Sequence, residues 1–287
     1  MMTQKDRTLV VIPTIAMIKN GSGIIDLAYD LIKSGAATST PVGNWIDVLV
    51  VSNGNYNGKF HWHDNMDSDN FDGHFKTFST GTNLHWLHSC NLGLFQAIAK
   101  QYSYVMLLND DVEVSDNFVP TLIEAAHDNP HAGIIAPVYN GFWGDQQCVG
   151  DNWKPDPSHP NRNARYVDGT CMLIRTSLIR EIGMLDAEFG TPGWGADVDY
   201  CYRARETGKA VIVAPHAYLK HDSRIGGTSA QHVYGSIAEW QRKGAQQACE
   251  DLTRKYGPEF RQLLELPQDA YRPTEKSIKN VEILRNS

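Results

Sequence analysis

Val105-Met-Leu-Leu-Asn-Asp-Asp-Val-Glu-Val114 is the stretch that decides the fold. It opens with an apolar run of strand length that stops at two adjacent carboxylates, Asp110 and Asp111. This pattern predicts a buried strand that brings charge to its carboxyl end, where open α/β sheets bind ligands. Because neighbouring carboxylates repel each other, the pair favours a divalent cation or a proton. The alternative is a solvated turn before a helix capped by Asp116 or Asn117.

Composition sets the broad class of the protein. The 287 residues, 41% of them hydrophobic, suffice for one large α/β domain or two modest ones. The formal net charge of −7 argues against a broad electrostatic footprint for nucleic acid or anionic membranes. Five scattered cysteines without a Cys-x-x-Cys pair are typical of buried thiols in a reducing compartment. No hydrophobic leader and no long apolar stretch is present in the sequence, so we expect a cytoplasmic protein.

The N-terminal part has the pattern of a nucleotide-binding unit. Leu9–Thr14 and Trp45–Val51 are β-branched runs that predict buried strands, and apolar residues at helical spacing between them predict a helix ending at Gly35. Strand, helix and strand in this order open a βαβ unit. Residues 55–82 are polar and aromatic, and their histidines lack a ligand spacing typical of a metal site. We expect a surface insertion there that rims the pocket or forms an irregular edge.

Further elements follow on both sides of the acidic pair. A glycine- and proline-rich segment at 141–166 predicts a long loop, which in a compact domain tends to be functional. Periodicity predicts helices over 91–101, 118–126 and 177–182 and strands over 133–138, 166–174 and 211–214.

A second informative stretch is Phe189–Gly208, a glycine-rich loop that leads into a helix. Asp197 and Asp199 lie in the expected first turn, where the helix dipole favours carboxylates, so simple capping is an alternative to function. Two acids beside a tryptophan, Trp194, that we expect to be exposed also fit a binding site. The stretch therefore remains open between these two interpretations.

The last strand leads to a segment rich in polar and glycine residues. His221 is expected to begin a flexible loop that carries Lys220 and Arg224 and is suited to closing over phosphates. From about Ser229 the composition changes and predicts helices that act as a lid, a brace or an oligomer contact.

Together these stretches resemble the inverting GT-A glycosyltransferases of family 2, the group that includes rhamnosyl- and galactofuranosyltransferases. The resemblance covers residues 8–229 and implies a Rossmann-like mixed α/β sheet flanked by helices, with a C-terminal helical extension. It divides the chain into a domain of residues 1–230, with a nucleotide-sugar half to about 112 and an acceptor half over about 113–230, and a tail of residues 231–287. Six motifs carry it in the family's order: Val10–Thr14, Val50–Gly54, Asn91–Gly93, Leu107–Val112, Gly193–Ala204 and His221.

The resemblance also implies roles for individual residues. Asp111 and His221 would bind Mn²⁺ or Mg²⁺, and Asp197 would be the base that deprotonates the acceptor hydroxyl. The donor would be a nucleoside-diphosphate sugar, held by Pro13, Thr14, Ser52, Asn53, Asn91, Gly93, Asp110 and Arg224. The acceptor would be held by Trp194, Asp199 and Asp168.

Two positions depart from the family pattern. Ser52 stands where the family usually has an acid that contacts the nucleotide, so the nucleotide stays open. Ala196 stands where an acid usually precedes the base, which removes an acceptor contact and leaves Asp197 in place.

The expected function is metal-dependent, inverting transfer of a hexosyl or deoxyhexosyl group to a hydroxyl of a glycan, a protein or a modified nucleobase. The alternatives are a nucleotidyltransferase and a catalytically inactive module that binds nucleotide sugars or carbohydrate. A nucleotidyltransferase would need a basic, glycine-rich first loop, and residues 13–23 contain only Lys19 as a basic residue. Asp111, Asp197 and His221 together argue against an inactive module.

Overall fold

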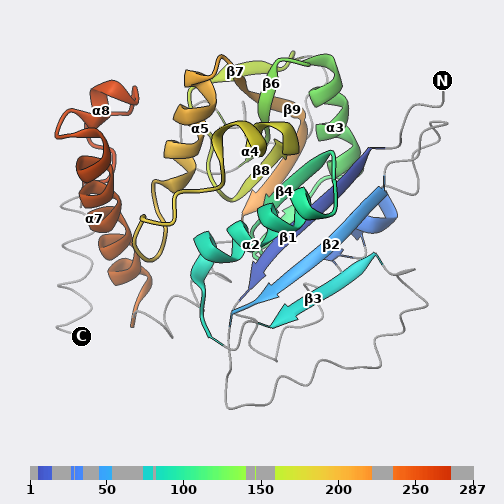
Figure 1. Ribbon diagram of the computed structural model, residues 1–287, viewed down its shortest axis with the longest axis horizontal. Coiled ribbons are helices and arrows are strands. Elements are labelled where there is room, and N and C mark those ends of the chain that lie inside the picture. The colour runs from blue at the N-terminus through green and yellow to red at the C-terminus, as the bar shows by residue number, and fades with distance from the viewer. Residues whose placement is uncertain are drawn as a thin grey trace.

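Strands and helices are interspersed along the chain (Figure 1). The computed structural model describes residues 6–14, 27–28, 30–34, 45–53, 74–79, 82–139, 146, 159–221 and 235–272. The strands are β1 (Arg7–Thr14), β2 (Trp45–Ser52), β3 (Phe75–Ser79), β4 (Tyr104–Leu108), β5 (Val112–Val114), β6 (Ala132–Tyr139), β7 (Arg162–Ala164), β8 (Cys171–Arg175) and β9 (Ala210–His221). The helices are α2 (His85–Ala99), α3 (Phe118–Asp128), α4 (Thr176–Ile182), α5 (Ala196–Glu206), α7 (Ile237–Tyr256) and α8 (Phe260–Leu263). Residues 27, 28 and 30–34 are helical, as their apolar spacing predicts.

One mixed sheet organises these elements. Within the described ranges its nine strands follow the order β3-β2-β1-β4-β8-β6-β9-β5, with β7 paired to β9. Alternate residues of the central strands enter two different cores, as Val11 and Ile12 of β1 do. Helices α2, α4, α5, α7 and α8 pack on the Val11 face, and α3 with residues 27–31 packs on the Ile12 face. Because both faces are covered, β1, β4 and β6 are apolar almost throughout. The prediction of a mixed α/β sheet flanked by helices is confirmed.

Polar strand ends meet at one edge of this sheet. Strands β1, β2 and β4 are parallel, β8 is antiparallel to β4 and β6, and β9 is parallel to β6. The carboxyl ends of β1, β4, β6 and β9 and the amino end of β8 therefore share an edge. This arrangement collects Thr14, Asp110, Asp111, Asp168 and His221 from distant parts of the sequence.

Three predicted boundaries are wrong. Strand β8 begins at Cys171 and not at Tyr166, because the preceding residues form a turn in which the Asp168 carboxylate accepts the Thr170 amide. Helix α2 starts at His85, well before the predicted Asn91. Strand β9 does not end at residue 214 but continues to His221, since β5 and β6 pair with its second half.

The capping alternative for the acidic pair fails for one of its two residues. Asn117 is the N-cap of α3, but its backbone is left-handed, with φ 54°, and its side chain makes no capping hydrogen bond. The predicted polar insertion contributes β3, an edge strand parallel to β2. Residues 55–73 and 80–81 of that insertion, most of the predicted 141–166 loop and Cys148 lie outside the described residues.

The C-terminal helices belong to the main core. Side chains of Ala248, Leu252 and Phe260 pack in the same cluster as those of α5. The predicted domain boundary at residue 230 lies outside the described residues, and the division near residue 112 falls at the start of β5. One sheet thus continues through both predicted halves.

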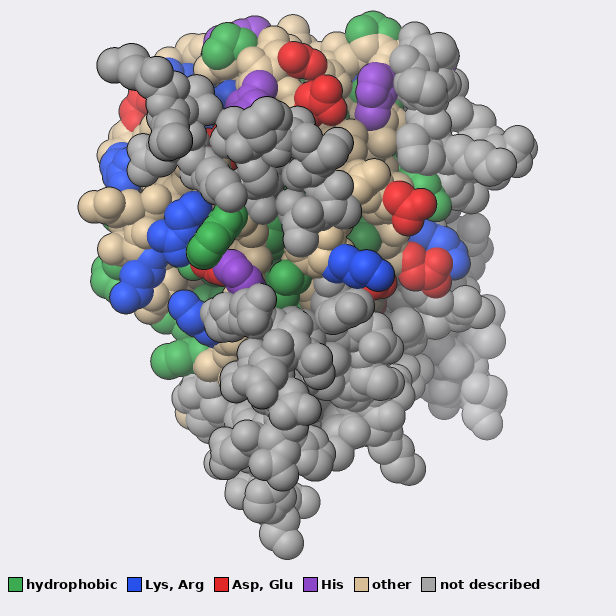
Figure 2. Space-filling model, turned by 90° about the vertical axis from the view of Figure 1, so that its right-hand side faces the viewer, with side chains coloured by type: hydrophobic (Ala, Val, Ile, Leu, Met, Phe, Trp, Pro, Cys, Tyr) green, Lys and Arg blue, Asp and Glu red, His purple; other side chains and the backbone are tan. Residues whose placement is uncertain are grey.

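The surface and the helices give two further observations. On the face drawn in Figure 2, acidic, basic and histidine side chains all appear, and the hydrophobic ones lie among them in small groups. None of the helices in the described part of the chain has the length and apolar character needed to cross a membrane.

Candidate active site

The strand ends carry a cluster of Thr14, Asp110, Asp111 and His221, which we call the β4 cluster. His221 Nε2 lies 3.1 Å from Asp111 Oδ1, because β9 and β5 pair with His221 opposite Val112. Burial opposes protonation of His221, but the hydrogen bond and charge of Asp111 outweigh burial and raise its pKa. Asp111 and His221 are distant in sequence and adjacent in space. The carboxylate suits Mn²⁺ or Mg²⁺, and the imidazole nitrogen favours a transition ion such as Mn²⁺ over Mg²⁺.

The metal-ligating set offered by the described residues is incomplete. Nowhere in the described ranges do three or more His, Cys, Asp or Glu side chains gather in a group that could hold an ion. Mg²⁺ commonly binds through one or two protein carboxylates and takes its other ligands from substrate phosphates and water. The Asp111–His221 pair therefore fits a metal that is bound together with a phosphorylated substrate.

Asp110 connects the β4 cluster to the first strand. Thr14 Oγ1 donates a hydrogen bond of 2.6 Å to Asp110 Oδ2. Burial raises the pKa of Asp110 to about 6, and the charge of Asp111 adds to this effect, while the Thr14 hydrogen bond opposes it. The end of β4 is therefore fixed against the end of β1, next to Pro13.

A second group, which we call the α5 cluster, consists of Asp168, Gly169 and Asp197. Asp197 Oδ2 accepts the Gly169 amide at 2.9 Å, and its Oδ1 accepts the Val198 amide at 2.8 Å. Although Asp197 retains some exposed surface, desolvation of its carboxylate raises its pKa to about 7, with a further contribution from the charge of Asp168. A carboxylate with this pKa is more basic than a solvated aspartate and still ionises near neutral pH.

The turn before β8 joins the two clusters. The carbonyl of Thr170 accepts the amide of Asn109 at 2.9 Å, next to Asp110. Asp168 Oδ1 accepts the Thr170 amide at 2.8 Å and also contacts the Thr170 hydroxyl. The Asp168 amide donates to Gln146 Oε1 at 2.8 Å. The predicted acceptor residue Asp168 and the predicted base Asp197 are thus neighbours beside the end of β4.

Three predicted donor-binding residues, Asn53, Asn91 and Gly93, make contacts that join neighbouring parts of the fold. Asn53 is buried, and its Oδ1 accepts the Leu84 amide at 3.2 Å and the Ser89 hydroxyl at 2.7 Å, which fixes the start of α2. The Asn91 side-chain amide bonds both backbone groups of Leu185. A Cβ on Gly93 would lie 2.3 Å from the Val11 side chain, so this glycine permits close packing of α2 on β1. These contacts explain all three residues without a bound donor.

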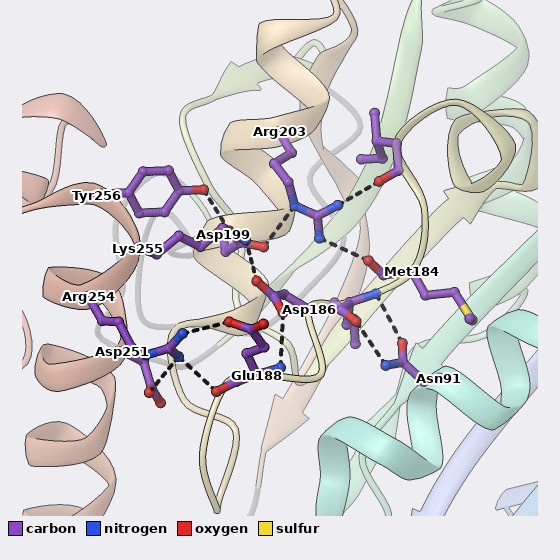
Figure 3. Close-up of polar contacts among 12 residues, drawn as sticks. Asn91, Met184, Asp186, Glu188, Asp199, Arg203, Asp251, Arg254, Lys255 and Tyr256 are labelled. Carbon is purple, nitrogen blue, oxygen red and sulfur yellow. Dashed lines mark hydrogen bonds and ion pairs between the residues drawn. The ribbon is translucent and has the colours of Figure 1, made fainter.

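Asp199 has its partners inside the protein. Its side chain is 0% exposed and meets Arg203 Nε at 2.8 Å, Lys255 Nζ at 2.6 Å and the Tyr256 hydroxyl at 2.6 Å (Figure 3). A fully buried carboxylate with a hydrogen bond and two cationic partners has its charge satisfied. We therefore leave Asp199 out of the proposed acceptor site and assign it to the contact between α5 and α7.

The loop that precedes Asp197 is held by α7. Lys255 Nζ lies 2.5 Å from Asp186, and Arg254 bridges Glu188 at 2.8 Å and Asp251 at 3.0 Å (Figure 3). Asp251 Oδ2 also accepts the Gly190 amide at 2.7 Å. The glycine-rich loop is therefore anchored at several points to a helix far along the chain.

Trp194 belongs to the same contact. A Cβ on Gly244 of α7 would lie 2.7 Å from its indole, and the Trp240 ring is 5.2 Å away at 84°. Trp194 is partly buried, so the expectation of an exposed side chain is wrong; its acceptor role stays a prediction. The side chain of Ser52 and all of Arg224 lie outside the described residues.

Sequence reasoning missed three aromatic residues near the α5 cluster. A Cβ on Gly169 would lie 2.7 Å from the ring of Trp86 and 3.5 Å from Asp197 Oδ2. Burial raises the pKa values of Tyr139 and Tyr271, and the charges of Asp168 and Asp197 add to this. Single aromatic residues carry no local signal of function, so only their spatial position could identify them.

Comparison with known proteins gives a family match and several relatives. Residues 46–183 match the family model described as Glycosyl transferase family 2. Uncharacterized proteins of Mycobacterium tuberculosis and Mycobacterium bovis are 33% identical to the chain over 172 residues, which are 58% of this chain and 63% of theirs. The chain thus spans 63% of the length of these curated relatives.

Solved structures share the fold. A crystal structure of GalNAc-T7 with UDP, GalNAc and Mn²⁺ matches with a TM-score of 0.57 and 12% identity, over 92% of this chain and 55% of that one. The fragment 1–349 of S. aureus TarS matches with a TM-score of 0.50 and 16% identity, over 87% and 72%. The fold is that of the GT-A glycosyltransferases.

Proposed function

We propose that the protein is a metal-dependent, inverting glycosyltransferase that moves a hexosyl or deoxyhexosyl group from a nucleoside diphosphate to an acceptor hydroxyl. The observation that carries this proposal is the arrangement at the sheet edge. The Asp111–His221 pair lies two residues beyond Asn109, whose amide binds the turn before β8 at Thr170. A basic carboxylate, Asp197, accepts the Gly169 amide of the same turn. Transfer of a sugar from a diphosphate needs these two functions, a cation site for the leaving group and a base for the nucleophile.

The β4 cluster would bind the donor. Asp111 and His221 would hold Mn²⁺ or Mg²⁺, which when bound neutralises charge on the departing diphosphate. Asp110 would contact the ribose through the carboxylate that Thr14 orients, and Pro13 would border the same pocket. Buried and hydrogen-bonded groups such as these keep their geometry when a ligand binds, which favours recognition.

The α5 cluster would perform the proton transfer. The acceptor hydroxyl would donate its hydrogen bond to Asp197, lose its proton to that carboxylate and attack the anomeric carbon. The bond from that carbon to the diphosphate oxygen breaks as the new bond forms on the opposite face, so configuration inverts. The two amides that bind Asp197 fix the carboxylate in place, and its pKa of about 7 matches a base that works near neutral pH.

Asp168 and Trp194 would complete the acceptor side. The charge of Asp168 contributes to the high pKa of Asp197. Its carboxylate would accept a second hydroxyl of the acceptor. Trp194 would offer the exposed part of its indole to the acceptor, which we propose to be a glycan.

Donor binding tests the proposed function directly. Thermal unfolding would be measured with UDP-, dTDP-, GDP- and CDP-sugars, each with and without Mn²⁺. A ligand at a hundred times its Kd that binds only the folded state adds about 2.7 kcal/mol to the free energy of unfolding. We expect one nucleotide family to raise the Tm in a Mn²⁺-dependent way. If none of these donors raises the Tm with Mn²⁺ present, the glycosyltransferase proposal fails.

A further inference from the structure

Two tryptophans near the site have no role in the function proposed so far. Trp86 is at the start of α2, and Trp240 lies in the first turn of α7, beyond the family-matched residues 46–183. Both side chains are partly exposed, as is that of Trp194. Large aromatic side chains that keep exposed area beside a catalytic group commonly contact the substrate.

Trp86 borders the space around the predicted base. Its Cζ2 and Cη2 atoms lie 2.7 Å and 2.9 Å from the point where Gly169 would carry a Cβ, and Asp197 Oδ2 lies 3.5 Å from the same point. The Gly169 amide binds this carboxylate oxygen. The absence of a side chain on Gly169 therefore lets an indole and the base share one space. A hydroxyl bound to Asp197 would bring the ring that carries it next to Trp86.

Trp194 and Trp240 continue from this position toward α7. A Cβ on Gly193 would lie 2.9 Å from Leu87 Cβ, so the chain neighbours of Trp194 and Trp86 are in contact. Trp194 then packs against α7 at Gly244, and Trp240 meets it edge to face. The order from the base outward is thus Trp86, Trp194 and Trp240: the rings of Trp194 and Trp240 are in contact, and Trp86 is linked to Trp194 through their chain neighbours Leu87 and Gly193.

The chemistry of such a row favours a saccharide. A sugar ring has one or two faces made of C–H groups, which pack on an aromatic ring, while its hydroxyls stay at the rim for water or carboxylates. Successive rings of an oligosaccharide need successive surfaces of this kind. The net charge of −7 disfavours a nucleic acid, whose phosphates need compensating cations.

We propose that Trp86, Trp194 and Trp240 form an acceptor site for a saccharide of at least two units, with the reacting unit on Trp86 and a distal unit on Trp240. The proposal rests on the proposed function for the direction of the chain, since the reacting hydroxyl is placed at Asp197. It adds two residues to the acceptor side and makes α7 part of the substrate site.

Binding to the full chain would be measured by saturation-transfer NMR and by quenching of tryptophan fluorescence. The probes are glucose, galactose, mannose, rhamnose and N-acetylglucosamine, together with a trisaccharide of each. We expect at least one trisaccharide to bind about tenfold more tightly than its monosaccharide, which is about 1.4 kcal/mol. Trp240→Ala should abolish that preference and leave monosaccharide binding unchanged. Trp86→Ala should weaken both, and Trp86→Phe should restore most of the loss.

Controls separate this proposal from misfolding and from the proposed function. Trp45→Ala removes a tryptophan that is 47% exposed at the start of β2, away from the site edge, and should leave all saccharide binding intact. Circular dichroism and the Tm shift by a donor with Mn²⁺ should be unchanged in the Trp86 and Trp240 variants. If a donor raises the Tm but no saccharide binds, the saccharide site on the three tryptophans is wrong and the proposed function stands. If saccharides bind in a tryptophan-dependent way but no donor raises the Tm, the glycosyltransferase proposal is wrong and the saccharide site stands.

Two further results would overturn the proposed saccharide site on the three tryptophans. One is a folded Trp240→Ala protein that keeps the full preference for the trisaccharide. The other is binding only to a DNA duplex with hydroxymethylated pyrimidines, weakened by Trp86→Ala, which would make the acceptor a nucleobase.

Discussion

In the β4 cluster, Asp110 and Asp111 directly follow a central strand and His221 ends another, so the hydrogen bonds of the sheet set their positions. In the α5 cluster, Asp197 opens a helix whose preceding loop is anchored by ion pairs and packing from α7. The first cluster is built by the sheet and the second by contacts between surface elements. A substitution in α7 that breaks these contacts should therefore displace Asp197 and leave the Asp111–His221 pair unchanged.

The largest effect is expected from Asp197→Asn. Loss of a positioned base typically costs a hundred- to ten-thousandfold in rate, so the transfer rate should fall by about that factor. Donor binding should survive, because the β4 cluster is untouched. Asp116→Asn, an exposed acid before α3, is the control and should keep full activity. Steady-state kinetics would check this prediction, and full turnover by Asp197→Asn would remove the base assignment.

Substitutions in the β4 cluster should change the response to metal. Removing even an outer-shell partner costs about ten- to a hundredfold in metal affinity, so Asp111→Ala should raise the Mn²⁺ concentration needed for donor binding by at least about tenfold. His221→Ala should act in the same direction. Titration of Mn²⁺ in the thermal-shift assay measures both effects. An unchanged requirement in His221→Ala would reduce this residue to a structural role.

The contact between α5 and α7 should appear in the stability of the protein. Lys255→Ala leaves the fully buried Asp199 with one cation fewer, and we expect the free energy of unfolding to fall by about 1–3 kcal/mol. The matched control is Lys209→Ala, because its ion pair with Glu181 is 3.7 Å long and exposed on both sides; it should cost less than about 1 kcal/mol. Urea unfolding followed by circular dichroism compares the two. Equal losses of unfolding free energy in the two variants would mean that the Lys255 contact stabilises the protein no more than an exposed ion pair does.

The smallest effect is expected in the pH dependence of kcat/KM. Asp197 must be ionised to accept a proton, so kcat/KM should rise with pH through the raised pKa of about 7. Asp168→Asn removes a negative charge that contributes to this pKa, so the acidic limb should move to lower pH. A limb that stays in place would mean that Asp197 is not the titrating base or that Asp168 does not act on it.

The raised pKa of Asp197 suits a base at neutral pH, but ionisation of this carboxyl lowers the stability of the fold. A carboxyl whose pKa is higher in the folded state binds its proton more tightly there. Asp197 therefore disfavours folding increasingly as pH rises from the ordinary aspartate range to about 7. In Asp197→Asn the free energy of unfolding should lose this component of its pH dependence, which urea unfolding at several pH values would show.

The local sequence predicted the structure best where the residues of a single element determine its conformation. The runs in β1, β2, β4 and β6 predicted buried strands correctly, because a strand covered on both faces is apolar over most of its length. The sequence was less informative where distant segments decide. Strand β9 extends to His221 through pairing with β5 and β6, and no local pattern in residues 215–221 contains that information. Asp168 was predicted within a strand, but it lies in the turn before one.

The sequence by itself determined the α/β class, the order of the motifs and the acids that end β4, since these depend on hydrophobic pattern and on residue type. Only the tertiary structure brought His221 to Asp111, assigned Asp199 to a buried ion-pair network and put Trp86 beside Asp197. Asp197 and Asp199 look alike in the sequence because both lie in the first turn of one helix. They differ because successive positions on a helix point in different directions, so Asp199 is directed to Lys255 and Asp197 to the turn before β8.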